Sequence, residues 1–275
     1  MGDYLEVYRR KGYAVVRGVF DPAEVAEIGA AMDQVYAEGV AHGRSFRHGN
    51  LFYNVVTGPD GRPHVPMAQW PSYHNAVLNR VRLDPRYLAI LEPLIGRDLK
   101  QIINQLHWKL PNSRGDFAWH QDSRFRKPEH AYRNLGESYV QTGLAIDPHN
   151  PESGGMRFIP GSQKLGTVDL DTSTEVLGTT PEDAALEAAG LSPADEVPLI
   201  LEPGDVAMWN PYLVHASGTN RSSHLRRLYI NGYVRAADCD RGEWAFRDGQ
   251  PVPLGPEPAL VHYEQLREDS EPHYV

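Results

Sequence analysis

The sequence contains a single cysteine, Cys239, among its 275 residues. One thiol cannot form a disulfide within the chain, which favours a reducing compartment such as the cytoplasm. No apolar run approaches the roughly 18 residues that span a bilayer, and the first residues lack the apolar stretch of a secretory signal. We therefore expect a cytoplasmic protein that has no membrane partner.

An excess of positive charge is also lacking. The chain has 27 lysines and arginines against 36 acidic residues, a net charge of −9, and the basic residues are scattered. Nucleic-acid-binding proteins usually concentrate basic residues in a patch, so we expect no nucleic-acid partner. The 41% of hydrophobic residues suffices for a sizeable core. No linker or internal repeat interrupts the chain, and we predict one domain over residues 1–275, as a monomer or a homodimer.

The helix-rich N-terminal part, residues 1–98, has clear helix signals. A short helix is expected over 3–11 and a strand over 13–17. The tetrapeptide DPAE at 21–24 combines an N-cap, a proline in the first turn and an acid at the third position. A further helix begins at Asp84-Pro85 and ends at Gly96. The stretch HVPMAQWPSYHN, 64–75, is expected to be a loop over the mouth of a pocket.

From residue 100 the sequence predicts short strands separated by Pro/Gly turns. They lie at 101–110, 138–146, 156–159, 197–201, 206–209 and 225–234. Many short strands with such turns are typical of a sandwich or barrel. The expected fold class is therefore mainly β with flanking helices, with the β core at about 100–235 and a polar, proline-rich tail after it. A helix at 180–189 lies in an inserted segment, 172–196, that we interpret as a lid.

The octapeptide AWHQDSRF, 118–125, carries two metal-binding side chains. We expect a strand over Phe117–Asp122, and because side chains alternate along a strand, His120 and Asp122 would point to one face. His215, in WNPYLVHASGTN, is the best third ligand. Two imidazoles and one carboxylate are typical of Fe(II) oxygenases, and zinc binds such a set as well. The ligand types alone leave the metal open.

Two further residues predict a carboxylate site beside the metal. Arg226 begins the strand that follows His215, and Ser217 lies two residues after this histidine. A guanidinium holds a carboxylate through two parallel hydrogen bonds, and a hydroxyl adds a third donor. A dicarboxylic acid would then chelate the metal at one end and contact Arg226 and Ser217 at the other.

The motifs WHQD (119–122), ESGGMRFIPGS (152–162) and EPGDVAMWNPYLVHASGTN (202–220), together with Arg226, resemble the phytanoyl-CoA dioxygenase family of Fe(II)/2-oxoglutarate-dependent oxygenases. The N-terminal KGYAVVRGVFDPAEVAEI (11–28) does so too. The resemblance implies a double-stranded β-helix, the cupin-like jelly roll. It implies Fe(II), 2-oxoglutarate and O2, with His120, Asp122 and His215 as iron ligands and with Ser217 and Arg226 as 2-oxoglutarate ligands.

The resemblance also concerns residues near the co-substrate. Gln105, His107 and Lys109 share one face of a strand whose counterpart lines the co-substrate pocket, so Gln105 and His107 are candidates to face it, and Gln141 is a further candidate. Gly143 stands where many members carry a bulky residue, so another side chain must fill that space. Because Asp122 is present where related halogenases have glycine or alanine, halogenation is not expected.

The expected activity is oxidation of a small molecule, with release of succinate and CO2. Hydroxylation is the default outcome; desaturation, epoxidation, epimerisation and cyclisation are alternatives. Without a basic patch for a CoA carrier, we expect a free metabolite, in bacterial secondary metabolism. The candidate substrate residues are Tyr53, Trp70, Arg124 and Phe125, with Phe52, Tyr73 and Arg126 nearby. A non-catalytic metal-binding or sensor protein is an alternative, as is a zinc hydrolase, for which neither motif offers a general-base glutamate.

Overall fold

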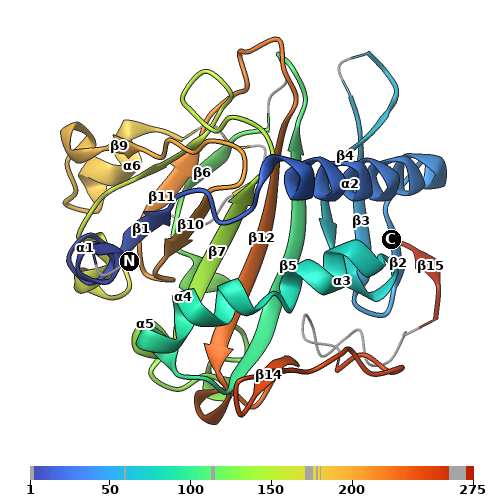
Figure 1. Cartoon of the computed structure of the whole chain (residues 1–275). Coiled ribbons are helices and arrows are strands. Elements are labelled where there is room, and N and C mark those ends of the chain that lie inside the picture. The colour runs from blue at the N-terminus through green and yellow to red at the C-terminus, as the bar shows by residue number, and fades with distance from the viewer. Residues whose placement is uncertain are drawn as a thin grey trace.

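The computed structural model describes residues 3–58, 60–112, 115–170, 176–177, 179, 181–259 and 271–275. Within these residues, two antiparallel sheets pack against each other and helices cover the outer face of the larger sheet (Figure 1). This arrangement confirms the predicted class, mainly β with flanking helices in a double-stranded β-helix. No helix in the described ranges is long and apolar enough to cross a membrane.

The larger sheet has eleven strands. Its main path runs β1 (Tyr13–Val16), β10 (Val206–Trp209), β7 (Tyr139–Ala145), β12 (Arg226–Arg235), β5 (Leu99–Lys109), β4 (Pro63–Gln69), β3 (Leu51–Thr57), β2 (Phe46–His48) and β15 (His273–Tyr274), while β13 (Glu243–Arg247) pairs with β5 and β14 (Gln250–Pro251) with β13. The smaller sheet has the order β6 (Phe117–His120), β11 (His215–Ser217), β8 (Met156–Phe158) and β9 (Val197–Pro198).

The helices are α1 (Asp3–Lys11), α2 (Pro22–His42), α3 (Ala76–Arg82), α4 (Pro85–Ile95), α5 (Leu135–Ser138) and α6 (Asp183–Ala188). Single 3-10 turns are η1 (Pro71–Tyr73), η2 (Asp122–Phe125), η3 (Glu129–Ala131), η4 (Ser162–Leu165), η5 (Pro193–Asp195) and η6 (Ala236–Asp238). Figure 1 shows α2, α3 and α4 in front of the larger sheet, with α2 over β3 and β4.

The predicted start of α2 is confirmed. The carboxylate of Asp21 accepts hydrogen bonds from the backbone N–H groups of Ala23 and Glu24, and Glu24 accepts from the N–H of Asp21. Ile28 and Met32 lie one turn apart on the buried side of the helix and are at most 1% exposed. Burying each such side chain contributes about 2 kcal/mol, so this face fixes α2 on the sheet.

The N-terminal part contains strands that the sequence did not predict. Residues 46–69 form β2, β3 and β4, so the expected loop HVPMAQ is a strand beside β5. Pro66 obscures the strand pattern, since proline cannot donate a ladder hydrogen bond. It falls where the β3–β4 register shifts, between the pairs Asn54↔Met67 and Val56↔His64. The sheet tolerates Pro66 at this irregular position. Residues 46–69 thus add three strands to the larger sheet.

The strand predicted over Phe117–Asp122 is shorter than expected. β6 ends at His120, and Asp122 begins the 3-10 turn η2. Asp122 therefore does not share a strand face with His120. The predicted helix at 180–189 is present as α6. Of the segment interpreted as a lid, positions 172–175, 178 and 180 lie outside the described residues.

Candidate active site

The three predicted metal ligands converge between the sheets. His120 ends β6 and His215 begins the neighbouring strand β11, where the two are cross-strand partners. The Nε2 atoms of His120 and His215 each lie 3.9 Å from Oδ1 of Asp122. One ligand atom from each residue lies within 4.8 Å of the other two, and all three residues are buried. Pairing of β6 with β11 brings together residues far apart in the sequence, and the turn η2 returns Asp122 to the same point.

Backbone carbonyls fix the tautomer of both imidazoles. Nδ1 of His120 lies 2.8 Å from the carbonyl oxygen of Ala118, and Nδ1 of His215 lies 2.9 Å from that of Leu213. A carbonyl only accepts, so each Nδ1 carries the proton and each Nε2 keeps its lone pair for a metal. Burial, followed by the neighbouring His215, lowers the pKa of His120 to about 3. Its imidazole is thus in the neutral, metal-binding form at physiological pH.

Trp209 orients the carboxylate of Asp122. Its indole Nε1–H donates to Oδ2 at 2.8 Å, which leaves Oδ1 facing the two imidazoles. Burial alone would raise the pKa of Asp122, but the imidazoles, Arg126 and this hydrogen bond outweigh it and lower the pKa. The group is therefore an anion, as a metal ligand must be.

Trp209 also fills the space beside Gly143. A Cβ on Gly143 would lie 3.2 Å from a ring carbon of Trp209 and 3.4 Å from Leu228. β10 and β7 are neighbours, with Trp209 opposite Gln141. Trp209 was not among the predicted site residues, although it stands in the same motif as His215. Its indole occupies the volume for which Gly143 left room.

Arg226 is a buried cation that makes no ion pair within the described parts of the chain. It is 3% exposed, its Nε has no hydrogen-bond partner there, and its Nη1 lies 3.5 Å from Nδ1 of His149. Burial lowers the pKa of Arg226 to about 10 although Asp147 acts against the shift, and the group stays charged at neutral pH. A buried charge without an ion pair is costly, so this position is suited to an anionic ligand.

The neighbouring Arg227 differs from Arg226. Its guanidinium contacts Asp147 at 2.9 Å and Asp33 at 3.0 Å. These contacts tie β12 to α2 and to the loop after β7. Arg227 is thus structural, whereas Arg226 is left for a ligand.

Lys109 stands behind the predicted carboxylate site. Its Nζ lies 2.8 Å from Oγ of Ser217, 3.1 Å from the carbonyl oxygen of Gly154 and 2.5 Å from that of Gly218. On the paired strands β5 and β12, Lys109 is directly opposite Arg226. The sequence placed Lys109 on the same face as His107 but gave it no role.

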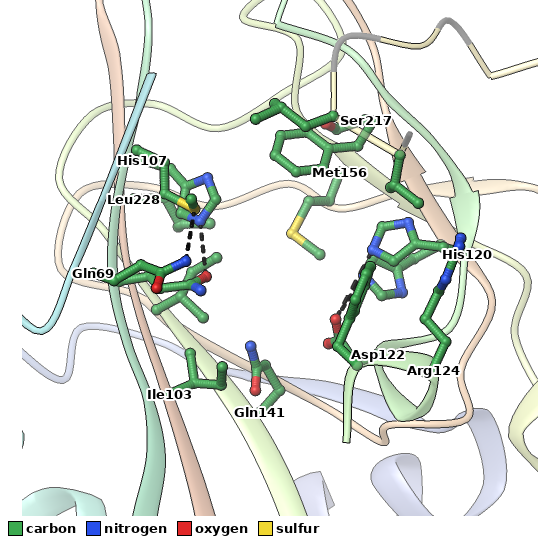
Figure 2. Close-up of a pocket in the computed structure, with 18 of the residues that line it drawn as sticks. Gln69, Ile103, His107, His120, Asp122, Arg124, Gln141, Met156, Ser217 and Leu228 are labelled. Atoms are coloured by element: carbon green, nitrogen blue, oxygen red, sulfur yellow. Dashed lines mark hydrogen bonds and ion pairs between the residues drawn. The ribbon is translucent and has the colours of Figure 1, made fainter. Parts of the chain in front are cut away.

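These groups surround a cavity of about 750 Å³ between the sheets. Figure 2 shows His120 and Asp122 on one side, with Gln69 and His107 across the open space. The predicted residues that line it are His120, Asp122, His215, Ser217, Arg226, Gln105, His107, Gln141, Phe52, Arg124, Phe125 and Arg126. Unpredicted lining residues include Asn54, Met67, Gln69, Ile103, Met156, Trp209 and Leu228. Among the described residues, Asp122 is the single acidic side chain in this lining.

Three predicted substrate residues do not line the cavity. Tyr53 is 2% exposed and packs under α2, with its hydroxyl donating to Glu38 at 2.9 Å. Trp70 is fully buried with a left-handed backbone (φ 53°). The hydroxyl of Tyr73 donates to Glu243 at 2.6 Å. Since residues alternate along β3, Phe52 faces the cavity and its neighbour Tyr53 faces the helices.

Most of the chain matches a known protein family. Residues 8–228 match the family model described as phytanoyl-CoA dioxygenase (PhyH). The chain belongs to the phytanoyl-CoA dioxygenase family. It is therefore an Fe(II)- and 2-oxoglutarate-dependent dioxygenase that uses O2, and its substrate is a small molecule. The match gives no support to a non-catalytic sensor. A zinc hydrolase would need a general base beside the metal, and Asp122 is the single acidic side chain in the described lining of the cavity.

Several known proteins are similar to most of the chain. The dioxygenase lolE1 of Epichloe uncinata is 25% identical over 89% of this chain and 85% of its own length. A probable α-ketoglutarate-dependent hypophosphite dioxygenase of Stutzerimonas stutzeri is 25% identical over 83% of this chain and 77% of its own. The structure of EctD from S. alaskensis is 20% identical, with a TM-score of 0.68 over 96% of this chain and 87% of that one. The epimerase SnoN from nogalamycin biosynthesis is 23% identical, with a TM-score of 0.61 over 92% and 94%. The two structural likenesses establish the jelly-roll fold.

Proposed function

We propose that this dioxygenase hydroxylates a small polar metabolite, with Fe(II) held by His120, Asp122 and His215. In the same proposal, Arg226 and Ser217 hold the distal carboxylate of 2-oxoglutarate. The proposal rests on the buried Arg226. Within the described residues it makes no ion pair, and it lines the same cavity as the three proposed metal ligands. Gln105, His107 and Gln141 line that cavity too and are proposed to contact the co-substrate.

The residues of the chain hold and orient the reactants. When bound, the iron and 2-oxoglutarate supply the oxidising chemistry, in which O2 is consumed and succinate and CO2 are released. Two imidazoles and one carboxylate bind a metal on one side and leave the opposite side open. Trp209 keeps Oδ1 of Asp122 directed at the metal position. Burial of the ligands between two sheets limits the access of water.

Hydroxylation is proposed as the default outcome of the oxidation, and the site itself argues only against halogenation. The carboxylate of Asp122 occupies the position that a halide would need, so halogenation is not proposed. The related structures include an epimerase, SnoN, and a carbocyclase, SnoK, both from nogalamycin biosynthesis. Epimerisation, cyclisation, desaturation and epoxidation therefore stay alternatives to hydroxylation on this fold.

The substrate is proposed to bind on the side of the cavity formed by β4 and β5. Gln69 lies opposite Gln105 in this strand pair, and its buried Oε1 has no hydrogen-bond partner among the described residues. A substrate hydroxyl or amine would supply the missing donor. At the cavity margin, Phe125 is 48% exposed and stacks with the guanidinium of Arg124. Both residues are proposed to contact the substrate as it enters.

The setting of the reaction is part of the same proposal. A cavity of about 750 Å³ suits a metabolite, and two relatives are named for hypophosphite and 2-aminoethylphosphonate, both small. The nogalamycin enzymes support a role in secondary metabolism, and the relatives from Stutzerimonas stutzeri and an uncultured bacterium support a bacterial setting. The single buried Cys239 is in keeping with the cytoplasm. We propose one catalytic domain, a monomer or homodimer, that needs neither nucleic acid nor a membrane.

Succinate formation tests the proposal. Protein purified without oxygen is given Fe(II) and 2-oxoglutarate, then O2, alone and with a panel of polar metabolites. We expect slow succinate release that the true substrate accelerates, and a mass increase of one oxygen atom in the product. His215→Ala and Asp122→Ala should remain folded and release no succinate above background. Succinate release by either variant at the wild-type rate would reject the metal-ligand assignment.

A further inference from the structure

Lys109 lies directly behind the carboxylate site and is 3% exposed. An ammonium group has three N–H donors, and three acceptors surround Nζ: the carbonyl oxygens of Gly154 and Gly218 and the hydroxyl of Ser217. Lys109 itself does not line the cavity, whereas Ser217 does (Figure 2). Lys109 thus reaches a ligand through Ser217.

Two protonation states of Lys109 fit this environment. When the amine is protonated, it donates to both carbonyls and to Oγ of Ser217, and the hydroxyl proton of Ser217 is free to point into the cavity. When the amine is neutral, its two N–H groups donate to the carbonyls and its lone pair accepts from Ser217. The amine and both carbonyl oxygens are satisfied in both states. The difference is the direction of the single hydrogen bond between Lys109 and Ser217.

We propose that Lys109 is a positioning residue for 2-oxoglutarate, whose distal carboxylate binds when Lys109 is protonated and the Ser217 hydroxyl is turned toward the cavity. The inference rests on the proposed function, in which Arg226 and Ser217 hold that carboxylate. A carboxylate only accepts hydrogen bonds, so it can use Ser217 when the hydroxyl does not donate to Lys109. Binding of the co-substrate is therefore coupled to uptake of a proton.

The surrounding charges give the sign of this coupling. Burial, then Arg226, lowers the pKa of Lys109 well below its ordinary value, and Asp116 opposes the shift. The charged or titratable groups that face Lys109 are Arg226 on β12, His107 on β5, His149 after β7, Arg157 on β8 and Asp116 before β6. A carboxylate bound at Arg226 adds negative charge and raises the pKa of Lys109. At a pH between the pKa of Lys109 in the free protein and its pKa in the complex, binding of 2-oxoglutarate takes up a proton. The affinity for 2-oxoglutarate therefore falls as the pH rises through this interval.

Calorimetry measures the proton directly. The Fe(II)-loaded protein is titrated without oxygen with 2-oxoglutarate in buffers that differ in ionisation enthalpy. Uptake of part of a proton is expected for 2-oxoglutarate. The control ligand is 2-oxobutyrate, which keeps the 2-oxo acid end but lacks the distal carboxylate, and for it no such uptake is expected. Absence of uptake with 2-oxoglutarate in the wild-type protein at every pH would overturn the inference without any variant.

Three variants test whether Lys109 acts through Ser217. Lys109→Met and Ser217→Ala should each weaken 2-oxoglutarate binding by about tenfold or more, the effect of a hydrogen bond to a charged group. The double variant should lose less than the product of the two single losses, because both remove one interaction. In Lys109→Met, binding of 2-oxoglutarate should also take up no more protons than binding of 2-oxobutyrate. Unchanged proton uptake in this variant, or losses of affinity that multiply in the double variant, would reject the coupling. Arg226→Ala tests the carboxylate site separately from the role of Lys109. If this variant bound 2-oxoglutarate with wild-type affinity, the carboxylate site would be rejected, and the inference about Lys109 with it.

Discussion

The indole Nε1–H of Trp209 donates to Oδ2 of Asp122 at 2.8 Å, while the same ring packs against Gly143. The pairing of β10 with β7 places the ring of Trp209. The register of these two strands therefore helps to orient the carboxylate of Asp122, a proposed metal ligand. Hydrogen bonds to metal ligands of this kind typically change metal affinity by 10- to 100-fold.

Trp209→Phe should therefore weaken binding of divalent metal by about tenfold or more. Phenylalanine keeps an aromatic ring beside Gly143 but lacks the N–H that orients Asp122. Metal titration of the metal-free protein measures the effect. The matched control is Trp119→Phe, next to His120, because Nε1 of Trp119 has no hydrogen-bond partner in the part of the chain that the structure describes. Equal metal affinities for the two variants would contradict the role assigned to Trp209.

Arg226→Ala should raise the KM for 2-oxoglutarate by roughly 10- to 100-fold, since it removes charge-assisted hydrogen bonds to the distal carboxylate. The adjacent Arg227→Ala breaks contacts to Asp147 and Asp33 instead. That variant should lower the free energy of unfolding and leave the KM unchanged. Steady-state succinate assays at varied 2-oxoglutarate, with urea denaturation alongside, distinguish the two arginines; a normal KM in Arg226→Ala would show that another group binds the carboxylate.

Gly232→Ala should destabilise the fold by about 1–3 kcal/mol through overpacking. Its Cβ would clash with Oη of Tyr139, whose hydroxyl donates to Gln141 in the cavity wall, and would lie 2.6 Å from Oε1 of Gln141. Adding Tyr139→Phe removes the nearer of these two oxygens and should recover part of the loss. Gly255→Ala, whose Cβ would meet its nearest atom at 3.8 Å, is the control and should have wild-type stability in urea denaturation. Equal stability of the two glycine variants would show that the sheet adjusts at Gly232.

Acid should destabilise the metal-free protein through its buried histidines. Burial, then Arg226 and Lys109, lowers the pKa of His107 from 6.5 to about 3. Between these values the unfolded chain binds more protons than the folded one. The free energy of unfolding therefore decreases as the pH falls, by at most about 1.4 kcal/mol per pH unit for each such group.

His107→Gln tests the contribution of this residue. The variant keeps a polar side chain in the cavity wall but cannot gain a proton. Urea denaturation below neutral pH should give a smaller dependence of unfolding free energy on pH than in the wild type. An unchanged pH dependence would mean that His107 does not stay neutral when buried.

The sequence by itself determined the fold class and the proposed metal ligands. The β-rich runs after residue 100 and the capping box at Asp21 are local patterns that can be recognised without knowledge of the tertiary contacts. His120, Asp122, His215 and Arg226 were identified from their chemistry, their spacing and the motifs in which they stand. The mutual positions of these residues could not be derived in this way: Asp122 reaches the site from a 3-10 turn rather than from the expected strand.

The tertiary structure decided which other residues belong to the site. The pairing of β4 with β5 places Gln69 in the cavity, and the alternation along β3 turns Tyr53 away from it. Trp209 and Lys109 acquire their contacts with Asp122 and Ser217 when strands distant in the sequence come together. Short-range patterns contain no information on such contacts, because they depend on which strands pair, in which register, and on which face each side chain is buried.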